Sequence, residues 1–497
     1  MNLSLTTFTL TSLPGALWLA AVLLYLAAAL RLLWQRRPPR APGHRMANLA
    51  LLPALLALVN LLWVADSPIA GLPARGVSGW LLASLILGLG AVIQRFSLRF
   101  LLGDRDQPRL QAWMAIATVA AASAWLTLSP LVLALSWGLA LLALVQLIGS
   151  ARDWPAARAA SRLAAQVLLV SWLALVAALA LGQLGGPEPA AWQRQLMAAL
   201  ILLAALLPAA QWPAQRWLMS SLVAPTPVSA IMHAGLVNGG ALLLISHAEL
   251  LAAVPWAQPA LLLMAALSLL VGAGMALVQV DVKRQLAAST VAQMGCLLVQ
   301  CALGAYVAAL IHLVLHALFK ANLFLQAGGQ LARAAPPRRR YQLLATVAVG
   351  VPLALIIIAL LPGRTLATDW FSALLLGMAA GHALAGLGPA LKRLTGWLWL
   401  GGLGLSFISG QYLLRQLLEG ALPVTSGPSL PWLLAALLLL LGGVTLLEAG
   451  RQMPRYRWSR WLYMQLVGAG EATARTIDSH PEHLHRRHLA ALAHHSE

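Results

Sequence analysis

The sequence predicts an all-α polytopic membrane protein with about fifteen transmembrane helices. Of its 497 residues, 60% are apolar and only 9% are charged, whereas a soluble protein needs a more highly charged surface. Apolar blocks of about twenty residues, the length that spans a bilayer, recur from end to end. No soluble domain of 100 residues or more fits between these blocks, so one membrane domain fills the chain.

The apolar blocks define the expected spans. The first block lacks the basic start and the small-residue cleavage site of a secretory signal, so we expect it to be retained as a helix. The expected spans are 15–35, 47–66, 78–102, 111–128, 130–150, 163–184, 194–210, 227–247, 259–280, 286–305, 306–328, 342–361, 367–390, 397–419 and 430–449.

The basic residues predict the orientation. A net charge of +19 would indicate nucleic-acid binding in a soluble protein, but these arginines lie in short loops beside apolar blocks, so we expect no nucleic-acid partner. Most odd-numbered loops are basic, although the seventh has Arg216 alone, and even-numbered loops carry about one basic residue at most. By the positive-inside rule, we expect the amino terminus outside and the carboxyl terminus in the cytoplasm, in a bacterial inner membrane.

One expected helix carries a line of titratable side chains. In ALIHLVLHALFKANLFLQAG (309–328), His312, His316 and Lys320 recur at a spacing of four, which places them on one helical face. The line is about 12 Å long, roughly a third of a hydrocarbon core. An ionised lysine there costs about 3 kcal/mol on insertion scales, so such residues are rare outside ion or proton pathways. Lys320 is therefore the first functional candidate.

Three interpretations of this line remain open: a proton or cation relay, a metal pair, or buried polar residues that bond neighbouring helices. The metal interpretation is weak, since no carboxylate or third histidine follows at the spacing of zinc enzymes. Histidine titrates near neutral pH, and a lysine in a low-dielectric environment releases its proton more readily than an exposed one. We favour the relay.

Proline interrupts the helical pattern at two places. The first interruption contains the amphipathic piece QRWLMSSLV (215–223), and the second precedes TLATDWF (365–371). Broken helices line polar cavities in transporters and mark related positions of two internal repeats, so these breaks predict an inverted repeat. The residues that mark them are Pro208, Pro213, Pro225 and Pro227 for the first, and Pro362 and Gly363 for the second.

Further pathway candidates lie at or after the two breaks. His233 follows the first break by one helical turn, in APTPVSAIMHAGLVNGG (224–240). Alone it would be an interhelical histidine, but unpaired backbone groups and water gather at breaks, which favours a functional role. Asp369 at the second break and His382 in the following block are candidates for lining the same path.

Asp281 and Lys283 lie at an expected cytoplasmic helix junction, next to Arg284. A surface ion pair together with the positive-inside charge explains them, and a coupling role is the alternative.

The segment after Gly450 changes in character. RQMPRYRWSRWLYMQLV (451–467) mixes arginine, tryptophan and tyrosine with apolar residues, which is typical of a helix that lies at the cytoplasmic interface or docks a partner. The candidate docking residues are Arg455, Trp458, Trp461 and Tyr463.

Neither the cysteines nor the histidine-rich end predicts a metal site. Cys296 and Cys301 fall five apart within one apolar block, which excludes a disulfide or metal framework. The stretch HPEHLHRRHLAALAHHSE (480–497) matches no defined ligand set, so we interpret it as a solvated or partner-bound tail.

Several segments resemble the antiporter-like membrane subunits shared by respiratory complex I, Mrp cation/proton antiporters and related systems. The likeness covers roughly residues 90–390. The segments that carry it are APTPVSAIMHAGL (224–236), LVQVDVKRQLAASTVAQMG (277–295) and ALIHLVLHALFKANLFLQAG (309–328), with RFSLRFLLGDRDQPRL (95–110) resembling the segment that precedes the family's core.

This resemblance implies two inverted five-helix repeats, each with a broken helix, and a line of polar residues at mid-membrane. Lys320 matches the family's central lysine, His312 and His316 match its neighbouring histidines, and His233 matches the histidine after the first break. The implied organisation is N-terminal transmembrane helices (1–110), a first antiporter-like repeat (111–248), a second repeat (259–390), C-terminal transmembrane helices (397–449) and a cytoplasmic amphipathic helix with a histidine-rich tail (450–497).

The chain also departs from the complex I pattern. Those subunits place a glutamate after a tryptophan in the fifth helix, but here Trp137 is followed by Gly138. They carry a lysine before the first break, where this chain has Pro208, and no lysine occurs between Ala321 and Leu391. Most of the acid and base pairs of redox-coupled pumping are therefore absent.

A single module with a cytoplasmic docking tail most resembles the membrane subunit of the DAB inorganic-carbon accumulation system. That resemblance implies that a cation gradient, which we expect to be of protons, energises a large cytoplasmic zinc partner similar to β-carbonic anhydrases, which converts CO2 to bicarbonate. We expect zinc in the partner and no cofactor here, because this chain has no cysteine and histidine zinc set. The alternatives are a subunit of a complex I-like oxidoreductase or Mrp-type Na+/H+ antiporter, and a non-conducting membrane anchor.

Overall fold

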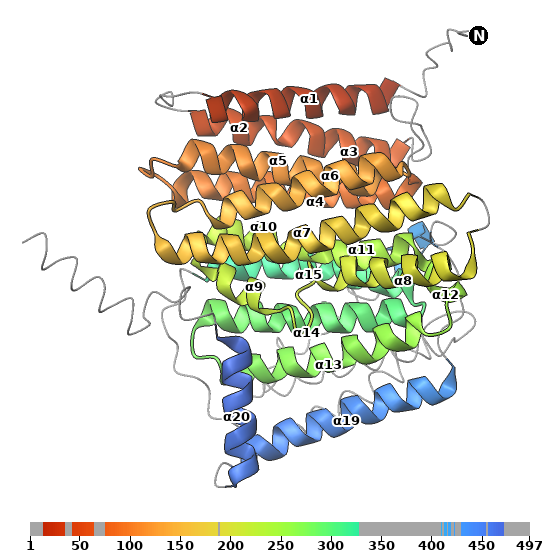
Figure 1. The fold of residues 1–497 in the computed structure, drawn as a ribbon. Helices are drawn as coiled ribbons and strands as arrows, with labels where there is room; N and C mark the ends of the chain where they lie inside the picture. Colours follow the sequence, from red (N-terminus) through yellow and green to blue (C-terminus); the bar gives the residue numbers. More distant parts are fainter. Residues whose placement is uncertain are drawn as a thin grey trace, which may run out of the picture.

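The long helices of the computed structural model lie roughly side by side and form a stack from α1 to α19 (Figure 1). The model describes residues 13–34, 42–63, 75–186, 189–327, 429–453 and 456–471, with short pieces between 409 and 422. The helices outside the central broken region are α1 (Leu13–Trp34), α2 (Pro42–Leu49), α3 (Leu51–Trp63), α4 (Gly76–Phe100), α5 (Gln107–Leu126), α6 (Pro130–Ile148), α7 (Pro155–Leu184), α8 (Ala191–Leu206), α13 (Ala257–Val278), α14 (Val282–Ala302), α15 (Tyr306–Gln326), α19 (Leu430–Gln452) and α20 (Arg457–Gly470).

The apolar blocks of the sequence account for these helices. Within the described residues, nine helices are long and apolar enough to cross a membrane. The prediction of an all-α polytopic membrane fold is thus confirmed. The predicted number of fifteen transmembrane helices is not confirmed. Three expected spans, 342–361, 367–390 and 397–419, lie wholly or largely outside the described residues, as does the second break.

The first predicted break is present between α8 and α10. After Leu206 the chain turns, forms the short helix α9 (Arg216–Ser220) and one 3-10 turn, η2 (Ser221–Val223), and enters α10 (Thr226–Ala234). Prolines explain the interruption, because a proline inside a helix removes a backbone hydrogen bond and clashes with the preceding turn. The Trp217 indole nitrogen donates to the Leu207 carbonyl at 2.9 Å and so satisfies one backbone group that the break frees.

A second interruption was not predicted. The expected span 227–247 divides into α10 and α11 (Gly239–Ser246), separated by the 3-10 turn η3 (Leu236–Asn238). The side-chain amide of Asn238 donates to the Ala234 carbonyl at 2.8 Å and caps the end of α10. The adjacent pair Gly239 and Gly240 is a signal in the sequence for such an irregular backbone.

Burial places this broken region at the centre of the molecule. In the span that combines α10 and α11, Thr226–Ser246, 94% of the residues of its 18-residue apolar stretch are buried, whereas the corresponding share for α19 is only 6%. Helices α4, α5, α14 and α15 surround α10 and α11 together with α8. Because lipid does not reach this region, polar side chains on these helices must bond to other protein groups or to ordered water. The remaining short helix, α12 (Ala248–Ala253), connects α11 to α13.

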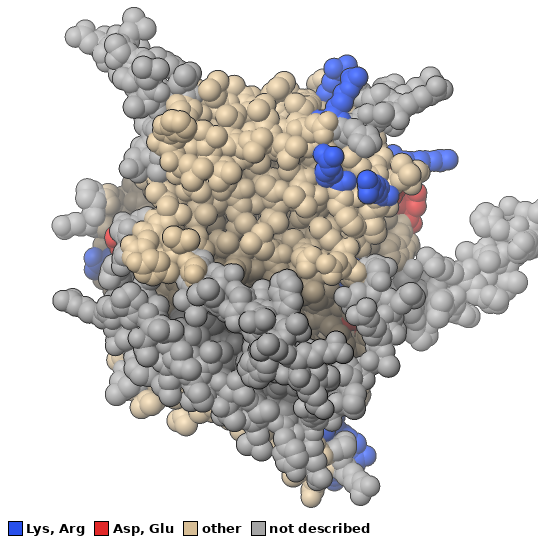
Figure 2. Space-filling model, turned by 180° about the vertical axis from the view of Figure 1, so that it is seen from behind, with Lys and Arg blue, Asp and Glu red and all other residues tan. Residues whose placement is uncertain are grey.

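Charged side chains on the described surface lie away from its middle. Where described residues form the surface in Figure 2, lysine and arginine side chains gather at the edges and leave a broad uncharged area between them. Figure 1 shows that the helices run from one of these edges to the other. This distribution is typical of a protein whose apolar belt faces lipid.

Helix α20 has a different direction from the others. It lies across the ends of the long helices beside α13, α14 and α19 (Figure 1). The Ser459 hydroxyl donates to the Gly450 carbonyl of α19 at 2.7 Å, and Gly274 of α13 provides room for the Leu466 side chain. Its direction and amphipathic sequence are those of a helix at a membrane interface.

We predict that Gly240→Ala destabilises the fold by about 1–3 kcal/mol, the usual effect of overpacking. A Cβ atom at Gly240 would overlap the Ala205 carbonyl oxygen of α8, a backbone atom that cannot move alone. Thermal unfolding of the detergent-purified protein measures the effect. Gly442→Ala on α19 is the matched control, since no atom lies within 4 Å of its Cβ position. Equal melting temperatures for the two variants would contradict the packing argument.

Candidate functional site

Lys320 is fully buried in α15, with no exposed side-chain area. Its ammonium nitrogen donates to two groups of α14, the Leu286 carbonyl and the Ser289 hydroxyl oxygen, each at 3.0 Å. In the described part of the chain, no carboxylate forms an ion pair with it. A neutral amine has two donors and one lone pair, so these two bonds would leave the lone pair free to accept a proton.

The two histidines continue from Lys320 along the same face of α15. His316 is buried, and its Nε2 lies 3.3 Å from the His233 carbonyl oxygen, to which it donates. The His312 ring lies 6.3 Å from the His316 ring, and its Nδ1 is 3.0 Å from the Gln300 Oε1 of α14. Each hydrogen bond favours one tautomer and leaves the other ring nitrogen as an acceptor. The side chains thus form the line that their spacing predicts.

His233 faces this line from α10. Its ring is fully buried and stacks on Phe324 of α15, with ring centroids 4.3 Å apart and an angle of 12° between the planes. Since Phe324 lies one turn beyond Lys320 and His316 one turn before it, His233 lies beside the buried amine. The structure therefore brings together His233, His312, His316 and Lys320.

Several unpaired polar atoms belong to this line or to the helices beside it. Both ring nitrogens of His233, Nδ1 of His316, the Ser229 hydroxyl and Oε1 of Gln293 are buried without a hydrogen-bond partner. Buried polar groups in proteins are normally bonded to protein or to ordered water. These atoms provide the donors and acceptors that a hydrated ion path requires.

Asp281 and Lys283 lie at the start of α14, on the same helix as the partners of Lys320. Asp281 caps the helix, because its carboxylate accepts from the Arg284 amide at 2.9 Å. Lys283 donates to the Ala224 carbonyl, where the break ends, at 3.3 Å. Our expectation of a surface ion pair is thus replaced by a helix cap and a contact to the break. Lys283 stays a candidate for coupling.

The first half of the molecule is packed with tryptophan where complex I subunits carry a glutamate. A Cβ atom at Gly138 would overlap the indole of Trp172, which donates to the Ala134 carbonyl at 2.8 Å. The neighbouring Trp137 packs against Trp125, with ring centroids 5.1 Å apart. These aromatic side chains fill the space with apolar atoms, so α6 and α7 offer no titratable group at this position.

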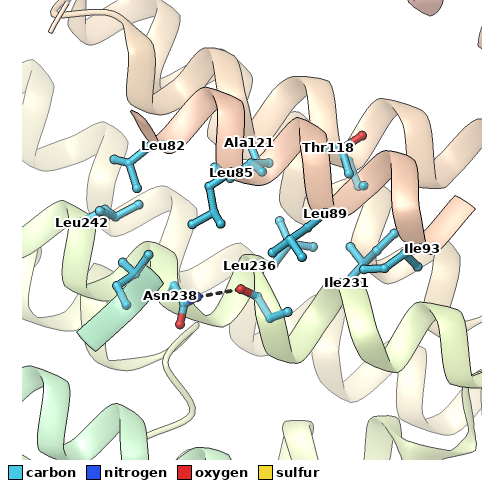
Figure 3. Close-up of a pocket in the computed structure, with 16 residues that line it drawn as sticks. Leu82, Leu85, Leu89, Ile93, Thr118, Ala121, Ile231, Leu236, Asn238 and Leu242 are labelled. Atoms are coloured by element: carbon cyan, nitrogen blue, oxygen red, sulfur yellow. Dashed lines mark hydrogen bonds between the residues drawn. The ribbon is translucent and has the colours of Figure 1, made fainter. Parts of the chain in front are cut away.

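A small cavity lies beside the broken helix. It is lined by α4, α5, the α10–α11 region and Leu313 of α15, and Figure 3 shows leucine and isoleucine side chains pointing into it. Among the lining residues, the Thr118 hydroxyl bonds to carbonyls of its own helix and the Asn238 amide bonds to Ala234. The cavity is therefore apolar, and its two polar side chains bond to backbone carbonyls.

The remaining candidates are dispersed or outside the described residues. Trp461 and Tyr463 on α20 are 64% and 52% exposed, and Trp458 is 37% exposed and packs near Gly450. Asp369, His382 and Arg455 lie outside the described residues. The part of the chain that the structure describes contains no cluster of three metal-ligating side chains.

Sequence reasoning missed the residues that hold the line in place. Ser289 and Gln300 of α14 are the hydrogen-bond partners of Lys320 and His312, and Phe324 supports the ring of His233. A signal was present: Ser289, Gln293 and Gln300 are four and seven residues apart, which places them on one face of an otherwise apolar helix.

Comparisons with known proteins identify the family of this chain. The family described as NADH:quinone oxidoreductase/Mrp antiporter, TM, matches residues 129–366. The Bacillus subtilis (strain 168) protein "Probable inorganic carbon transporter subunit DabB" is 37% identical over 475 residues, covering 87% of this chain and 90% of that protein. The Bacillus anthracis protein of the same name is 35% identical over 514 residues, covering 97% of this chain and 98% of that protein.

A solved structure shows the same fold. A chain of the Mrp complex from Dietzia sp. DQ12-45-1b superposes with a TM-score of 0.64 at 22% identity, covering 98% of this chain and 60% of the Mrp chain. The likeness to the two Bacillus proteins extends over nearly the whole length of each. The chain therefore belongs to the antiporter-like membrane-subunit family, within its group of DabB inorganic carbon transporter subunits.

Proposed function

We propose that this chain is the proton-conducting membrane subunit of an energy-coupled inorganic carbon transporter. The observation that carries the proposal is Lys320, a fully buried amine bonded only to a carbonyl and a hydroxyl among the described residues, in line with two histidines. Ionisable side chains at membrane depth are costly and mark ion or proton pathways. A neutral hydrogen-bonding role alone would be met by a smaller polar side chain at lower cost.

The proposed path follows α15. A proton from outside passes His312 and His316 to Lys320, and then leaves toward the cytoplasmic end of α14 at Lys283. Gln300 and Ser289 hold His312 and Lys320 in position at 3.0 Å each. Because the ring centroids of His312 and His316 lie 6.3 Å apart, we infer that water bridges the proton transfer between the two rings.

In this proposal the energy of proton flow serves a second subunit. The DabB relatives are named as transporter subunits, which supports assembly with a partner of the DabA type. The partner would be a cytoplasmic, β-carbonic-anhydrase-like zinc protein that hydrates CO2 to bicarbonate, docked on Trp458, Trp461, Tyr463 and Arg455. Zinc chemistry belongs to the partner, since this chain has only two cysteines, both within one membrane helix.

Two alternatives make different use of the same residues. An Mrp-type antiporter or a complex I-like pump would need acid and base groups in its first half, where Gly138 faces the Trp172 indole and Pro208 stands in place of a lysine. A non-conducting anchor would have no use for a buried amine. The DAB-type assignment fits both the filled first half and the titratable second half.

Lys320→Met and Lys320→Arg are both expected to abolish uncoupler-sensitive carbon uptake in carbonic-anhydrase-deficient cells that also express the partner. Methionine removes the titratable group, and arginine keeps its charge at every physiological pH and so cannot release a proton. Leu318→Ala, on the exposed face of the same helix, is the control. Membrane protein levels are checked by immunoblot. Full activity of Lys320→Arg alone would show that Lys320 acts as a fixed charge. Full activity of both variants would refute the relay and favour a non-conducting membrane anchor.

The transported ion is expected to be H+. Vesicles that contain the purified complex are given an inside-negative membrane potential by potassium diffusion. They should acidify internally at the same rate when Na+ is replaced by choline. A pH-sensitive dye trapped in the lumen measures the rate. Vesicles carrying the Lys320→Met variant provide the background. A flux that requires Na+ would assign the subunit to sodium transport.

The orientation predicted by the basic loops can be tested with single cysteines. Glu249→Cys, expected outside, should react with an impermeant maleimide in intact spheroplasts, and Arg152→Cys, expected inside, only after permeabilisation. Both positions are exposed, and the native Cys296 and Cys301 lie within a membrane helix, so background labelling stays low. The reverse labelling pattern would invert the predicted topology and the direction of the path.

A further inference from the structure

The contacts of Lys320 continue beyond the ion path to the surface helix α20. Lys320 is bonded to α14 through Leu286 and Ser289. One turn before Leu286, Lys283 is bonded to Ala224 at the end of the broken region. At the beginning of α9, in the same region, the side chain of Gln215 donates to the Ala469 carbonyl of α20 at 3.2 Å. Three hydrogen-bonded steps thus connect the buried amine with the interface.

The contact of Gln215 with α20 is built into the packing. Gln215 is 2% exposed, and its bond joins residues 254 positions apart in the chain. The neighbouring Gly470 is buried, and a Cβ atom there would overlap the side-chain amide of Gln279 at the end of α13. The last turn of α20 therefore rests on both the broken region and the α13–α14 junction.

This junction is the part of the described cytoplasmic edge where movement would be transmitted most directly. A break between helices can absorb a shift of its neighbours, because loop and helix-terminal residues take up changes in backbone angles. Ala224 at the end of the break accepts a hydrogen bond from Lys283 of α14, and Gln215 within the break donates one to Ala469 of α20. A shift of α14 when Lys320 changes its charge would reach α20 by this route.

We propose that Gln215 is a coupling residue, which links the broken helix to α20 and so transmits ion movement at Lys320 to the cytoplasmic partner. The inference rests on the proposed function, since it presumes both an ion flux and a partner that uses it. It assigns Gln215 a positioning role: the side chain lies outside the line of titratable groups and acts through α20. Proton flux and carbon uptake should therefore separate when this contact is removed.

The first test replaces Gln215 with methionine, which has a similar size and no donor. In the intact complex, Gln215→Met should keep proton flux within about twofold of wild type while carbon uptake falls about tenfold, within the usual range of a coupling free energy. The matched control is Gln452→Met on α19. Gln452 is exposed and bonded only to Glu448 one turn earlier, so both activities should stay unchanged.

A second pair of variants leaves Gln215 in place. Gly470→Leu would displace the end of α20 from Gln279 and should produce the same loss of uptake with retained flux. Gly468→Leu on the same helix is its control, because no atom lies within 4 Å of its Cβ position. If Gln215→Met fails to reach the membrane, this second pair of variants still tests the coupling role.

The outcomes separate the two proposals. Retained uptake in both Gln215→Met and Gly470→Leu would overturn the coupling role and leave the proton path intact. An equal loss of flux and uptake would also overturn it, because Gln215 would then belong to the path or to the fold. An absence of flux in the wild-type complex would refute the proposed function itself, and the coupling inference with it.

Discussion

The structure depends on the burial of one amine among packed helices. Lys320 has no exposed side-chain area, and its two partners are neutral groups of the neighbouring helix. Holding a positive charge in such a place is expensive, so the site tolerates the charge only briefly or with the help of water. The broken helix lies beside this line, where the His233 carbonyl accepts from His316 and both ring nitrogens of His233 are unpaired.

Apolar packing and titratable side chains occupy different helices of the described structure. Around α6 and α7, tryptophan indoles fill the position that holds a carboxylate in complex I subunits. Around α14 and α15, serine, glutamine, histidine and lysine face each other at hydrogen-bond distance. In the described part of the chain, the α6–α7 region is thus filled by apolar packing, and the α14–α15 region carries the titratable side chains.

Much of this arrangement was predictable from spacing alone. The helical period places His312, His316 and Lys320 on one face, and the prolines locate the first break, both of which the structure shows. The interruption at Gly235 was not predicted, because a single glycine is common in membrane helices; the pair Gly239 and Gly240 was the available signal, and the bond from Asn238 caps the end of α10. The partners Ser289 and Gln300 depend on how α14 rotates against α15, which is a property of tertiary packing.

The filled first half has a consequence for energetics. With one line of titratable groups, charges cross one at a time, and a single charge moving through 100 mV releases about 2.3 kcal/mol. Under the proposed function, at about 1.4 kcal/mol for each factor of ten, one proton per molecule of CO2 would sustain a bicarbonate accumulation of about fortyfold per 100 mV. A steeper gradient would require more protons per molecule through the same line, at the expense of speed. In that case the tryptophans of α6 and α7, by filling the first half, would limit the rate of carbon accumulation.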